Sequence, residues 1–397
     1  MVVKELIPRV YCVGALDRDR RIFDEIIPLP NGTSYNSYLI KGSQKTALID
    51  SVDPTKQDEL IENLEELKIK KIDYLVSNHA EQDHSGGIPR VLEAYPSVKV
   101  VTNMKCKEML KDLLLVPDNR FIVVSDGETL SLGDKTLKFI ISPWVHWPET
   151  MVTYLLEDKI LFSCDFFGSH LASNDASDDE VNEKLLAAAK RYYAEIMMPF
   201  RSHIKMHLEK LKGYQLKAIA PSHGPIYFKP AFIINAYKDW VSDQVRNIVV
   251  LPYVSMHGST LKMVEYFTAA LEKKGVEVKP YNLTKTDIGE LAMALVDAAT
   301  IVIASPTMLV GPHPSAFYAT YLVNILRPKI KYASVIGSYG WGGKMLDYIN
   351  GVLTATKPEI IEPVIVKGYP KKEDFNKLDR LAEQVWQKHR DNGLLIS

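Results

Sequence analysis

Four side chains of the kinds that bind metal ions lie within six residues of one another in the segment HAEQDH. The four are His79, Glu81, Asp83 and His84. Imidazole nitrogens and carboxylate oxygens are the ligands that zinc and non-haem iron commonly use. The preceding segment IDYLVS, residues 72–77, is apolar and β-branched, which predicts a buried strand. The candidate ligands therefore follow a strand end, where open α/β sheets place their binding sites.

The spacing of these residues indicates how they meet. In an extended segment side chains alternate, so His79, Glu81 and Asp83 are expected to point to one side. A turn beginning at Ser85-Gly86-Gly87 then brings His84 to the same space from another direction. One short segment can in this way supply ligands to two metal ions.

Three further candidate ligands follow apolar runs elsewhere in the chain. They are His146 in SPWVHWPET, Asp165 in ILFSCDFFG and His223 in AIAPSHGPI. Taken singly, each has an ordinary interpretation: a histidine packed among tryptophans, a turn-forming acid, and a loop histidine beside Gly-Pro. The first cluster, likewise, can be a solvated polar loop. Because all of them follow predicted strand ends, a shared metal site explains the pattern better.

The number of ligands and their charges suit two metal ions. Seven candidates are too many for one tetrahedral zinc ion. Two divalent ions carry four positive charges, and the three carboxylates carry three negative charges. A bridging hydroxide would cancel the one remaining positive charge. A site with this balance accepts a small neutral molecule.

A second group of candidate residues lies in three loops of the last third of the chain. The first loop, between an apolar strand and a helix-forming segment, is Ser255, Met256, His257, Gly258, Ser259 and Thr260. The others contain Ser305, Pro306, Thr307, Met308, Leu309, Val310 and Gly311, and Gly337, Ser338, Tyr339, Gly340, Trp341, Gly342 and Gly343. The first turn offers N–H groups, hydroxyls and a helix dipole to a phosphate, although a simple Ser/Thr helix cap is the ordinary alternative. All three loops follow strands, so they are expected to meet where a flavodoxin-like sheet binds FMN.

The glycines of these loops let the backbone approach a ring system, and Tyr339 or Trp341 can stack on it. A dinucleotide site is disfavoured because no G-x-G-x-x-G follows a strand.

The order of predicted elements divides the chain near Arg246. Residues 10–52 and 121–168 contain short alternating apolar runs with turn signals, and helices are predicted between and after them, as at residues 57–66. Residues 172–190 are acidic and turn-rich and then helical. After residue 246, strands and helices alternate to the end. We therefore expect an α/β protein, with an αββα sandwich over 1–246 and a flavodoxin-like, doubly wound parallel sheet over 247–397.

Composition limits the partners and the compartment. With 48 basic and 49 acidic residues the net charge is −1, so no overall field draws the protein to nucleic acid or to an anionic membrane. The hydrophobic content of 46% is enough for two cores. The scattered cysteines Cys12, Cys106 and Cys164 form no C-x-x-C pair, and no stretch of about 18 apolar residues occurs. These features predict a cytoplasmic protein without disulfides.

The pattern H-x-E-x-D-H-S-G-G, followed by the distant His, Asp and His, resembles the metallo-β-lactamase-like domain of flavodiiron proteins (A-type flavoproteins). The resemblance extends over essentially the whole chain. It implies one iron at His79, Glu81 and His146, a second at Asp83, His84 and His223, and Asp165 as the bridge. Some family members do not use the position of His84. His170 and Tyr193 fall in segments that resemble the surroundings of the family's site.

The resemblance also implies a function. Such a protein takes electrons from a small redox protein such as rubredoxin, holds them on FMN, and reduces O₂ to water or NO to N₂O. No Cys₄ rubredoxin domain is present in the sequence, so the donor is expected to be a separate partner, and the family implies a head-to-tail homodimer or a dimer of dimers. One departure concerns Met308, Leu309 and Val310, which replace the asparagines usual after Ser-Pro-Thr and bear on flavin potential more than on flavin binding.

Two other functions fit part of the sequence. One is a zinc hydrolase of the metallo-β-lactamase type fused to a flavodoxin, with a metal-bound hydroxide as nucleophile. Related hydrolases usually have His where this chain has Glu81, and a third carboxylate favours iron over zinc. The other is a non-enzymatic redox sensor, which the lack of an appended output domain disfavours. The residues themselves favour neither O₂ nor NO.

Overall fold

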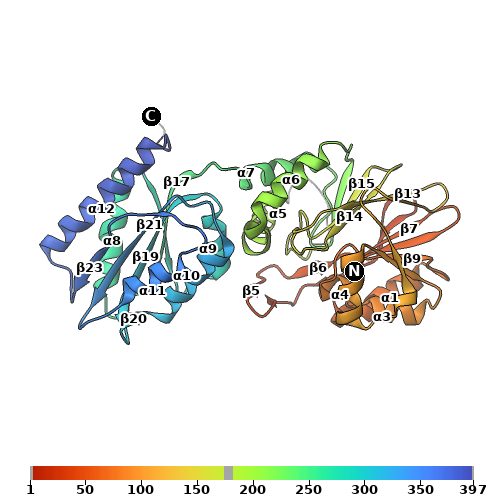
Figure 1. Ribbon diagram of the computed structural model, residues 1–397, viewed down its shortest axis with the longest axis horizontal. Helices are drawn as coiled ribbons and strands as arrows, with labels where there is room; N and C mark the ends of the chain where they lie inside the picture. Colours follow the sequence, from red (N-terminus) through yellow and green to blue (C-terminus); the bar gives the residue numbers. More distant parts are fainter. Residues whose placement is uncertain (1–2, 174–181, 396–397) are drawn as a thin grey trace. The chain divides into compact units, whose positions relative to one another are not determined.

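The computed structural model describes residues 3–173 and 182–395, which form two compact units (Figure 1). The first comprises Met1–Tyr193 with Phe200–Val241, and the second Ala194–Pro199 with Ser242–Ser397. Of the segment 172–190, predicted to be turn-rich and then helical, residues 174–181 lie outside the described residues, and a helix begins at Asn182.

The first unit contains a sheet with the strand order β1-β2-β7-β8-β9-β10-β11. Its strands are β1 (Lys4–Ile7), β2 (Val10–Cys12), β7 (Tyr38–Lys41), β8 (Thr46–Ile49), β9 (Tyr74–Val76), β10 (Lys99–Thr102) and β11 (Phe121–Val123). Pairing is antiparallel from β1 to β8 and parallel from β8 to β11. The connections of the parallel part contain α1 (Gln57–Glu66), α2 (Gln82–Ser85), α3 (Ile88–Ala94) and α4 (Met104–Leu114).

A second sheet of the same unit has the order β12-β13-β14-β15-β16. Its strands are β12 (Thr129–Ser131), β13 (Thr136–Ile141), β14 (Met151–Leu155), β15 (Ile160–Cys164) and β16 (Ala218–Pro221). Two short pairs, β3 (Ala15–Asp17) with β6 (Thr33–Tyr35) and β4 (Ile22–Phe23) with β5 (Ile27–Pro28), lie outside these sheets. The later helices of this unit are α5 (Asn182–Tyr192), α6 (Arg201–Leu211) and α7 (Pro230–Trp240). A π-helical turn, Tyr193–Met197, follows α5, and only its first residue belongs to this unit.

The core of the first unit lies between its two sheets. Ile40, Ile49 and Val101 of one sheet share a buried cluster with Phe139 and Phe162 of the other. Burying a side chain of this size contributes roughly 1.5–3 kcal/mol, which is why the apolar faces of both sheets turn inward. The predicted αββα sandwich is confirmed.

The second unit is built on a parallel sheet with the order β18-β17-β19-β21, continued by β22 and β23. Its strands are β17 (Arg246–Tyr253), β18 (Glu277–Asn282), β19 (Ala298–Met308), β21 (Tyr332–Tyr339), β22 (Glu359–Ile360) and β23 (Val364–Lys367), and β20 (Gly311–Pro312) folds back on β19. In chain order this is second, first, third, fourth and fifth, the flavodoxin-like arrangement. The predicted doubly wound sheet is confirmed.

Helices cover both faces of this sheet (Figure 1). They are α8 (Ser259–Glu272) and α12 (Lys372–Asp391) on one face, and α9 (Ile288–Leu295), α10 (Pro314–Leu326) and α11 (Met345–Val352) on the other. Among the described residues, no helix combines the length and the apolar character needed to cross a membrane.

Candidate metal centre and flavin site

The segment that carries the first four candidate ligands turns earlier than predicted. After β9 the chain is extended only as far as Glu81, which precedes the helical turn α2. The carbonyl of Glu81 accepts hydrogen bonds from the N–H groups of His84 (3.1 Å) and Ser85 (2.9 Å). The expectation that His79, Glu81 and Asp83 alternate along one extended segment is therefore wrong. Because neighbouring residues of a helix point about 100° apart, Asp83 and His84 are displayed by the turn itself.

One set of candidate ligands gathers around Glu81. Its carboxylate Oε2 lies 3.1 Å from Nε2 of His79 and 3.0 Å from Nε2 of His146. The other carboxylate of this set is Asp165, whose Oδ2 is 3.4 Å from His79 and 3.5 Å from His146 at the same nitrogens. These four side chains offer ligand atoms within 4.8 Å of one another.

A second set gathers on the other side of Asp165. The Oδ2 atom of Asp83 lies 3.2 Å from Nε2 of His84 and 3.0 Å from Nε2 of His223. The Oδ1 atom of Asp165 is 2.9 Å from Nε2 of His84 and 3.5 Å from Nε2 of His223. Asp165 thus turns one oxygen to each set, the geometry that a carboxylate bridging two metal ions requires.

The cluster compensates its own charges with protons. Burial alone would raise the pKa of Asp165, but the positive charges of His84 and His79 hold it well below its usual range. Burial lowers the pKa of His84 and His146, yet the facing carboxylates raise both to about 9. Metal ions bind in place of such protons, so metal binding here would release them.

The donor set fits two iron ions. Both oxygens of Asp83, the Oδ2 atom of Asp165 and both nitrogens of His84 are buried without a hydrogen-bond partner among the described residues. Buried polar atoms without partners are costly, so atoms of these types pointing at shared positions indicate metal ligands. Four imidazoles and three carboxylates match the mixed nitrogen and oxygen coordination of non-haem iron.

The loop of His223 is held by the strand β6. Its Nδ1 donates to the carbonyl of Ser34 at 2.7 Å, which leaves Nε2 facing the cluster. The next residue, Gly224, has φ +80° and donates its N–H to the hydroxyl of Ser34 at 2.7 Å. A Cβ at Gly224 would lie 2.5 Å from the carbonyl oxygen of Ser169, so only glycine fits there.

The two residues expected beside the ligands differ in their positions. His170 is buried, its ring centroid lies 5.0 Å from that of His223, and its Nδ1 is 2.9 Å from the hydroxyl of Thr33. The hydroxyl of Tyr193, in contrast, donates to the carbonyl of Trp240 at 3.3 Å. It is Tyr192 that donates to Oδ1 of Asp165, at 2.7 Å.

The hydroxyl of Tyr192 contacts Asp165 and that of Tyr193 contacts Trp240, because the helix changes between these two tyrosines. Tyr192 is the last residue of α5 and Tyr193 the first of the π-helical turn, so the two side chains point in different directions. The sequence shows two adjacent tyrosines, but it does not show where the helix ends, and the helix end decides which of them faces Asp165.

The three loops of the second unit meet at one end of the parallel sheet. They line a cavity of about 200 Å³ formed by Ser255, Met256, His257, Ser259, Thr260, Pro306, Thr307, Ser338, Tyr339, Gly340 and Gly368. The hydroxyls of Thr260 and Ser338, which both line it, are hydrogen-bonded to each other at 3.1 Å. Ser255 Oγ accepts the N–H groups of Gly258 (3.2 Å) and Leu261 (3.1 Å), which shapes the loop before α8. Gly258 itself has φ +88°.

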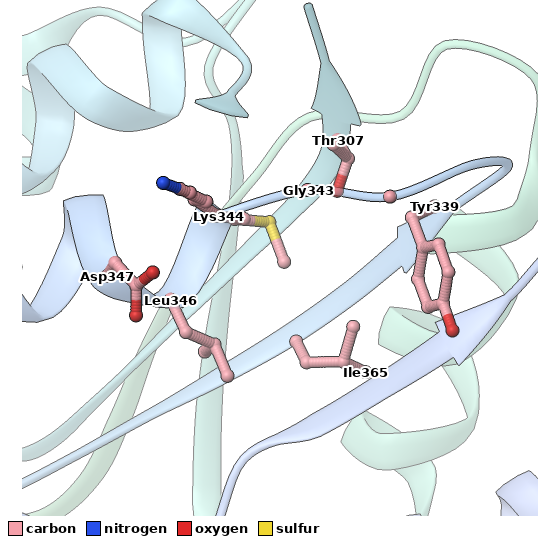
Figure 2. A pocket seen from close by; sticks show the side chains of 9 residues that line it. Thr307, Tyr339, Gly343, Lys344, Leu346, Asp347 and Ile365 are labelled. Carbon is pink, nitrogen blue, oxygen red and sulfur yellow. The ribbon is translucent and has the colours of Figure 1, made fainter. Parts of the chain in front are cut away.

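A larger cavity of about 460 Å³ adjoins the same loops (Figure 2). It is lined by Thr307, Tyr339, Gly342, Gly343, Lys344, Met345, Leu346, Asp347 and Ile365. Thr307 and Tyr339 line both cavities. The two cavities are therefore neighbours that share part of their lining, as sites for a phosphate and for the ring system joined to it would be.

Large apolar side chains stand at the rim of these loops. Leu309 is 84% exposed and Trp341 71%, while Met308 is half-buried. Leu309 and Val310 form the two-residue turn between β19 and β20, with φ +47° and +76°. Two-residue turns in which both residues have positive φ normally use Asn and Gly. The β-branched Val310 in this turn therefore stores strain of order 1–3 kcal/mol.

The fold and the two sites define a protein in which a metallo-β-lactamase-like metal domain is followed by a flavodoxin-like domain. The family model described as "ODP family beta lactamase" matches residues 33–224. A nitric oxide reductase from Moorella thermoacetica is 36% identical, over 95% of this chain and 96% of that protein.

Solved structures are similar over the whole chain. The rubredoxin oxygen:oxidoreductase from Desulfovibrio gigas has a TM-score of 0.94 at 30% identity, covering 98% of this chain and 99% of that one. The flavodiiron protein from Giardia intestinalis has a TM-score of 0.89 at 29% identity, covering 98% of each chain. This chain belongs to the flavodiiron protein family. It is an oxidoreductase, and its cofactors are FMN and a diiron centre.

Proposed function

We propose that this protein reduces O₂ to water, NO to N₂O, or both, at two iron ions, and that electrons reach the irons through FMN from a separate donor such as rubredoxin. The names of its relatives support both gases: the Desulfovibrio gigas structure is a rubredoxin oxygen:oxidoreductase, and the Moorella relative a nitric oxide reductase.

The observation that carries this proposal is the position of Asp165 between two sets of ligands. His79, Glu81 and His146 would hold one iron, Asp83, His84 and His223 the other, and Asp165 would bridge them. The location of the Nε2 atom of His84, 2.9 Å from Asp165, supports its inclusion. When bound, the irons supply reducing electrons and open coordination positions to a gas molecule.

The chain's own residues orient these ligands and exclude water from them. The hydroxyl of Tyr192 donates to Asp165, which fixes the direction of the bridging carboxylate. Phe23 packs against the rings of His170 and His223 at 5.0 and 5.9 Å between centroids. Burial lowers the pKa of His170 well below its usual range, so it remains neutral beside the cluster. These apolar and neutral neighbours suit a small, weakly polar substrate.

In the second domain, for which we propose residues 247–397, the phosphate of FMN would lie at the N-terminus of α8. The N–H groups of Ser259 and Thr260 and the hydroxyl of Ser338 would bind it. Its ring system would lie between the loops of Thr307 and Tyr339, with Trp341 as a stacking partner.

We also propose a head-to-tail homodimer, in which each flavin serves the irons of the other chain, as the family resemblance implies. The exposed apolar side chains of Leu309 and Trp341 at the flavin loops support a covered surface there. A cytoplasmic location is supported by the three buried cysteines Cys12, Cys106 and Cys164, none of which forms a disulfide bond.

The test is a gas-consumption assay with reduced rubredoxin, in sealed vessels that are free of oxygen until the gas is added. O₂ and NO are supplied in separate runs, and NADH without any donor protein serves as the control. The proposal predicts consumption of at least one gas that depends on rubredoxin. Hydrolysis of a lactam or ester by the zinc-loaded protein, with neither gas consumed, would instead favour the hydrolase.

A further inference from the structure

A fourth buried carboxylate lies beside the cluster, outside the set of candidate ligands. Glu149 is 1% exposed and lies two residues before β14. Its Oε1 accepts hydrogen bonds from Nδ1 of His79 at 2.6 Å and from the N–H of Ala80 at 3.0 Å. The carboxylate therefore holds both the ring and the backbone of the segment that begins the ligand run.

Glu149 is itself held in place from several sides. Its carbonyl accepts a hydrogen bond from the side-chain amide of Asn103 at 2.6 Å, and the same side chain caps α4. The N–H of Met151 donates to the carbonyl of Asn78 at 2.9 Å, which ties this strand to the segment of His79. Trp147 packs edge-on against the ring of His79, with 5.0 Å between centroids.

The contact at Nδ1 decides which nitrogen of His79 is available to a metal. A carboxylate can only accept, so Nδ1 keeps its proton toward Glu149, and the proton that a metal ion displaces is the one on Nε2, which leaves that lone pair for the metal. That Nε2 faces the cluster, 3.1 Å from Glu81 and 3.4 Å from Asp165. A carboxylate acceptor also makes the imidazole a stronger electron donor.

The candidate ligand histidines differ in the group that accepts a hydrogen bond from Nδ1. His223 donates its Nδ1 proton to the neutral carbonyl of Ser34. In the described part of the chain, no carboxylate other than Glu149 lies within hydrogen-bonding distance of the Nδ1 of a candidate ligand. The other buried acid nearby, Asp50, accepts instead from the two amide groups of Asn78, at 2.7 and 2.9 Å.

Charge balance points the same way. Glu81, Asp83 and Asp165 leave two divalent ions with one uncompensated positive charge. Where no hydroxide bridges the two ions, Glu149, which hydrogen-bonds to the ligand His79, supplies the balancing negative charge without occupying a coordination position.

We propose that Glu149 is a positioning residue that fixes the Nδ1–H tautomer of His79 and strengthens divalent metal binding at the position shared by His79, Glu81 and His146. This inference rests on the proposed diiron function, because it assigns a role toward the same metal pair. It makes the two metal positions unequal, since His223 on the other side has only a carbonyl partner.

The test is a titration of the metal-free, full-length protein with Co²⁺ alone. The absorption bands of the bound Co²⁺ report its binding. Wild type is compared with Glu149→Gln, which keeps an acceptor for Ala80 but removes the charge, and with the exposed Glu157→Gln as control. One of the two metal positions should weaken by roughly 10- to 100-fold in Glu149→Gln and neither in the control. Wild-type affinity at both positions of Glu149→Gln, or equal weakening of both, would overturn the proposal.

A second measurement needs no variant. Proton–nitrogen correlation spectra of the zinc-loaded wild type, labelled with ¹⁵N-histidine, should show His79 protonated at Nδ1, with that proton further downfield than the Nδ1 proton of His223. A proton on Nε2, or no difference between the two histidines, would refute the assignment even if Glu149→Gln fails to fold. If the wild type binds no pair of metal ions, it is the diiron function that fails.

Discussion

Asp165 carries more of the proposed chemistry than any other residue, because its two oxygens face different sets of histidines. Oδ1 lies near His84 and His223, and Oδ2 near His79 and His146. A buried carboxylate in this position costs free energy unless positive charge surrounds it. Two metal ions provide that charge directly.

Removing this carboxylate should therefore empty both metal positions. In Asp165→Ala we expect loss of most of the bound iron and at least roughly 100-fold lower gas reduction, while FMN remains bound on its separate domain. Metal and flavin analysis measure both quantities in one sample. The exposed Asp118→Ala serves as control, and Asp165→Ala protein that keeps its iron would show that this residue is no ligand.

Some single residues were predictable from the sequence and others were not. The seven candidate ligands follow apolar strands, so their strand-end placement could be predicted. Glu149 carries no such mark, because its role arises from a contact with His79, seventy positions away along the chain. The choice of Tyr192 over Tyr193 depends on where α5 ends, and sequence periodicity does not fix helix ends to one residue.

At the scale of elements, short turns decide the geometry of both sites. The helical turn α2 could not be anticipated from HAEQDH, since a turn of four residues is too short for an amphipathic pattern. The preceding strand β9 is shorter still, but it lies in the apolar, β-branched run of residues 72–77, which predicted it well. The loop before α8 was predictable because hydroxyl residues and a glycine follow a strand and precede a long helix.

The N-terminus of α8 provides a test of the proposed phosphate site. A carboxylate about 4 Å from a phosphate costs about 4 kcal/mol at an effective dielectric constant of about 20. We therefore expect Ser259→Asp to lose FMN affinity by several hundred-fold. Ser259→Asn, equal in size but neutral, is the control and should retain most of the flavin. Equal FMN affinity in the two variants would place the phosphate elsewhere.

Helix α12 makes the flavin domain sensitive to acid. His389 is buried between Thr300 and Asn247, with 2.7 Å from its Nε2 to the threonine hydroxyl and 2.8 Å from its Nδ1 to the asparagine oxygen. Burial lowers the pKa of His389 from 6.5 to about 4. Below pH 6.5 the unfolded chain binds a proton that the folded chain refuses, so this contribution to stability is present above pH 6.5 and is lost as the pH falls toward about 4.

The expected loss is roughly 2–3 kcal/mol. His389→Gln cannot take up this proton, so its unfolding temperature should fall less than that of the wild type between about pH 7 and about pH 4.5. Flavin release on heating measures the transition of this domain. If the unfolding temperatures of the two proteins fell equally with pH, His389 would not contribute to the acid sensitivity.

At the scale of the whole molecule, the sequence predicted the fold of each domain because each sheet buries its apolar faces in a regular pattern. The core residues of β13 and the continuous apolar run of β19 illustrate the two cases, a half-covered antiparallel strand and a fully covered parallel one. Assembly was not predictable in this way, because surface side chains such as Trp341 show no periodic pattern.

Assembly has a direct test in mixed dimers. Chains with Asp165→Ala lack irons, and chains with both Ser259 and Thr260 replaced by Asp lack flavin, so no single chain holds both cofactors. If each flavin serves the partner's irons, a mixed dimer contains one complete pair and regains up to about half of the wild-type activity. If electron transfer occurs within one chain, the mixture stays inactive and the head-to-tail arrangement is refuted.

The most direct test of the central proposal is the metal and flavin content of the protein purified without oxygen. Elemental analysis and flavin absorbance on the same sample should give two iron atoms and one FMN per chain, with little zinc. Two zinc atoms per chain and no iron would contradict the diiron assignment, and would favour the zinc hydrolase as the function of the seven-ligand cluster.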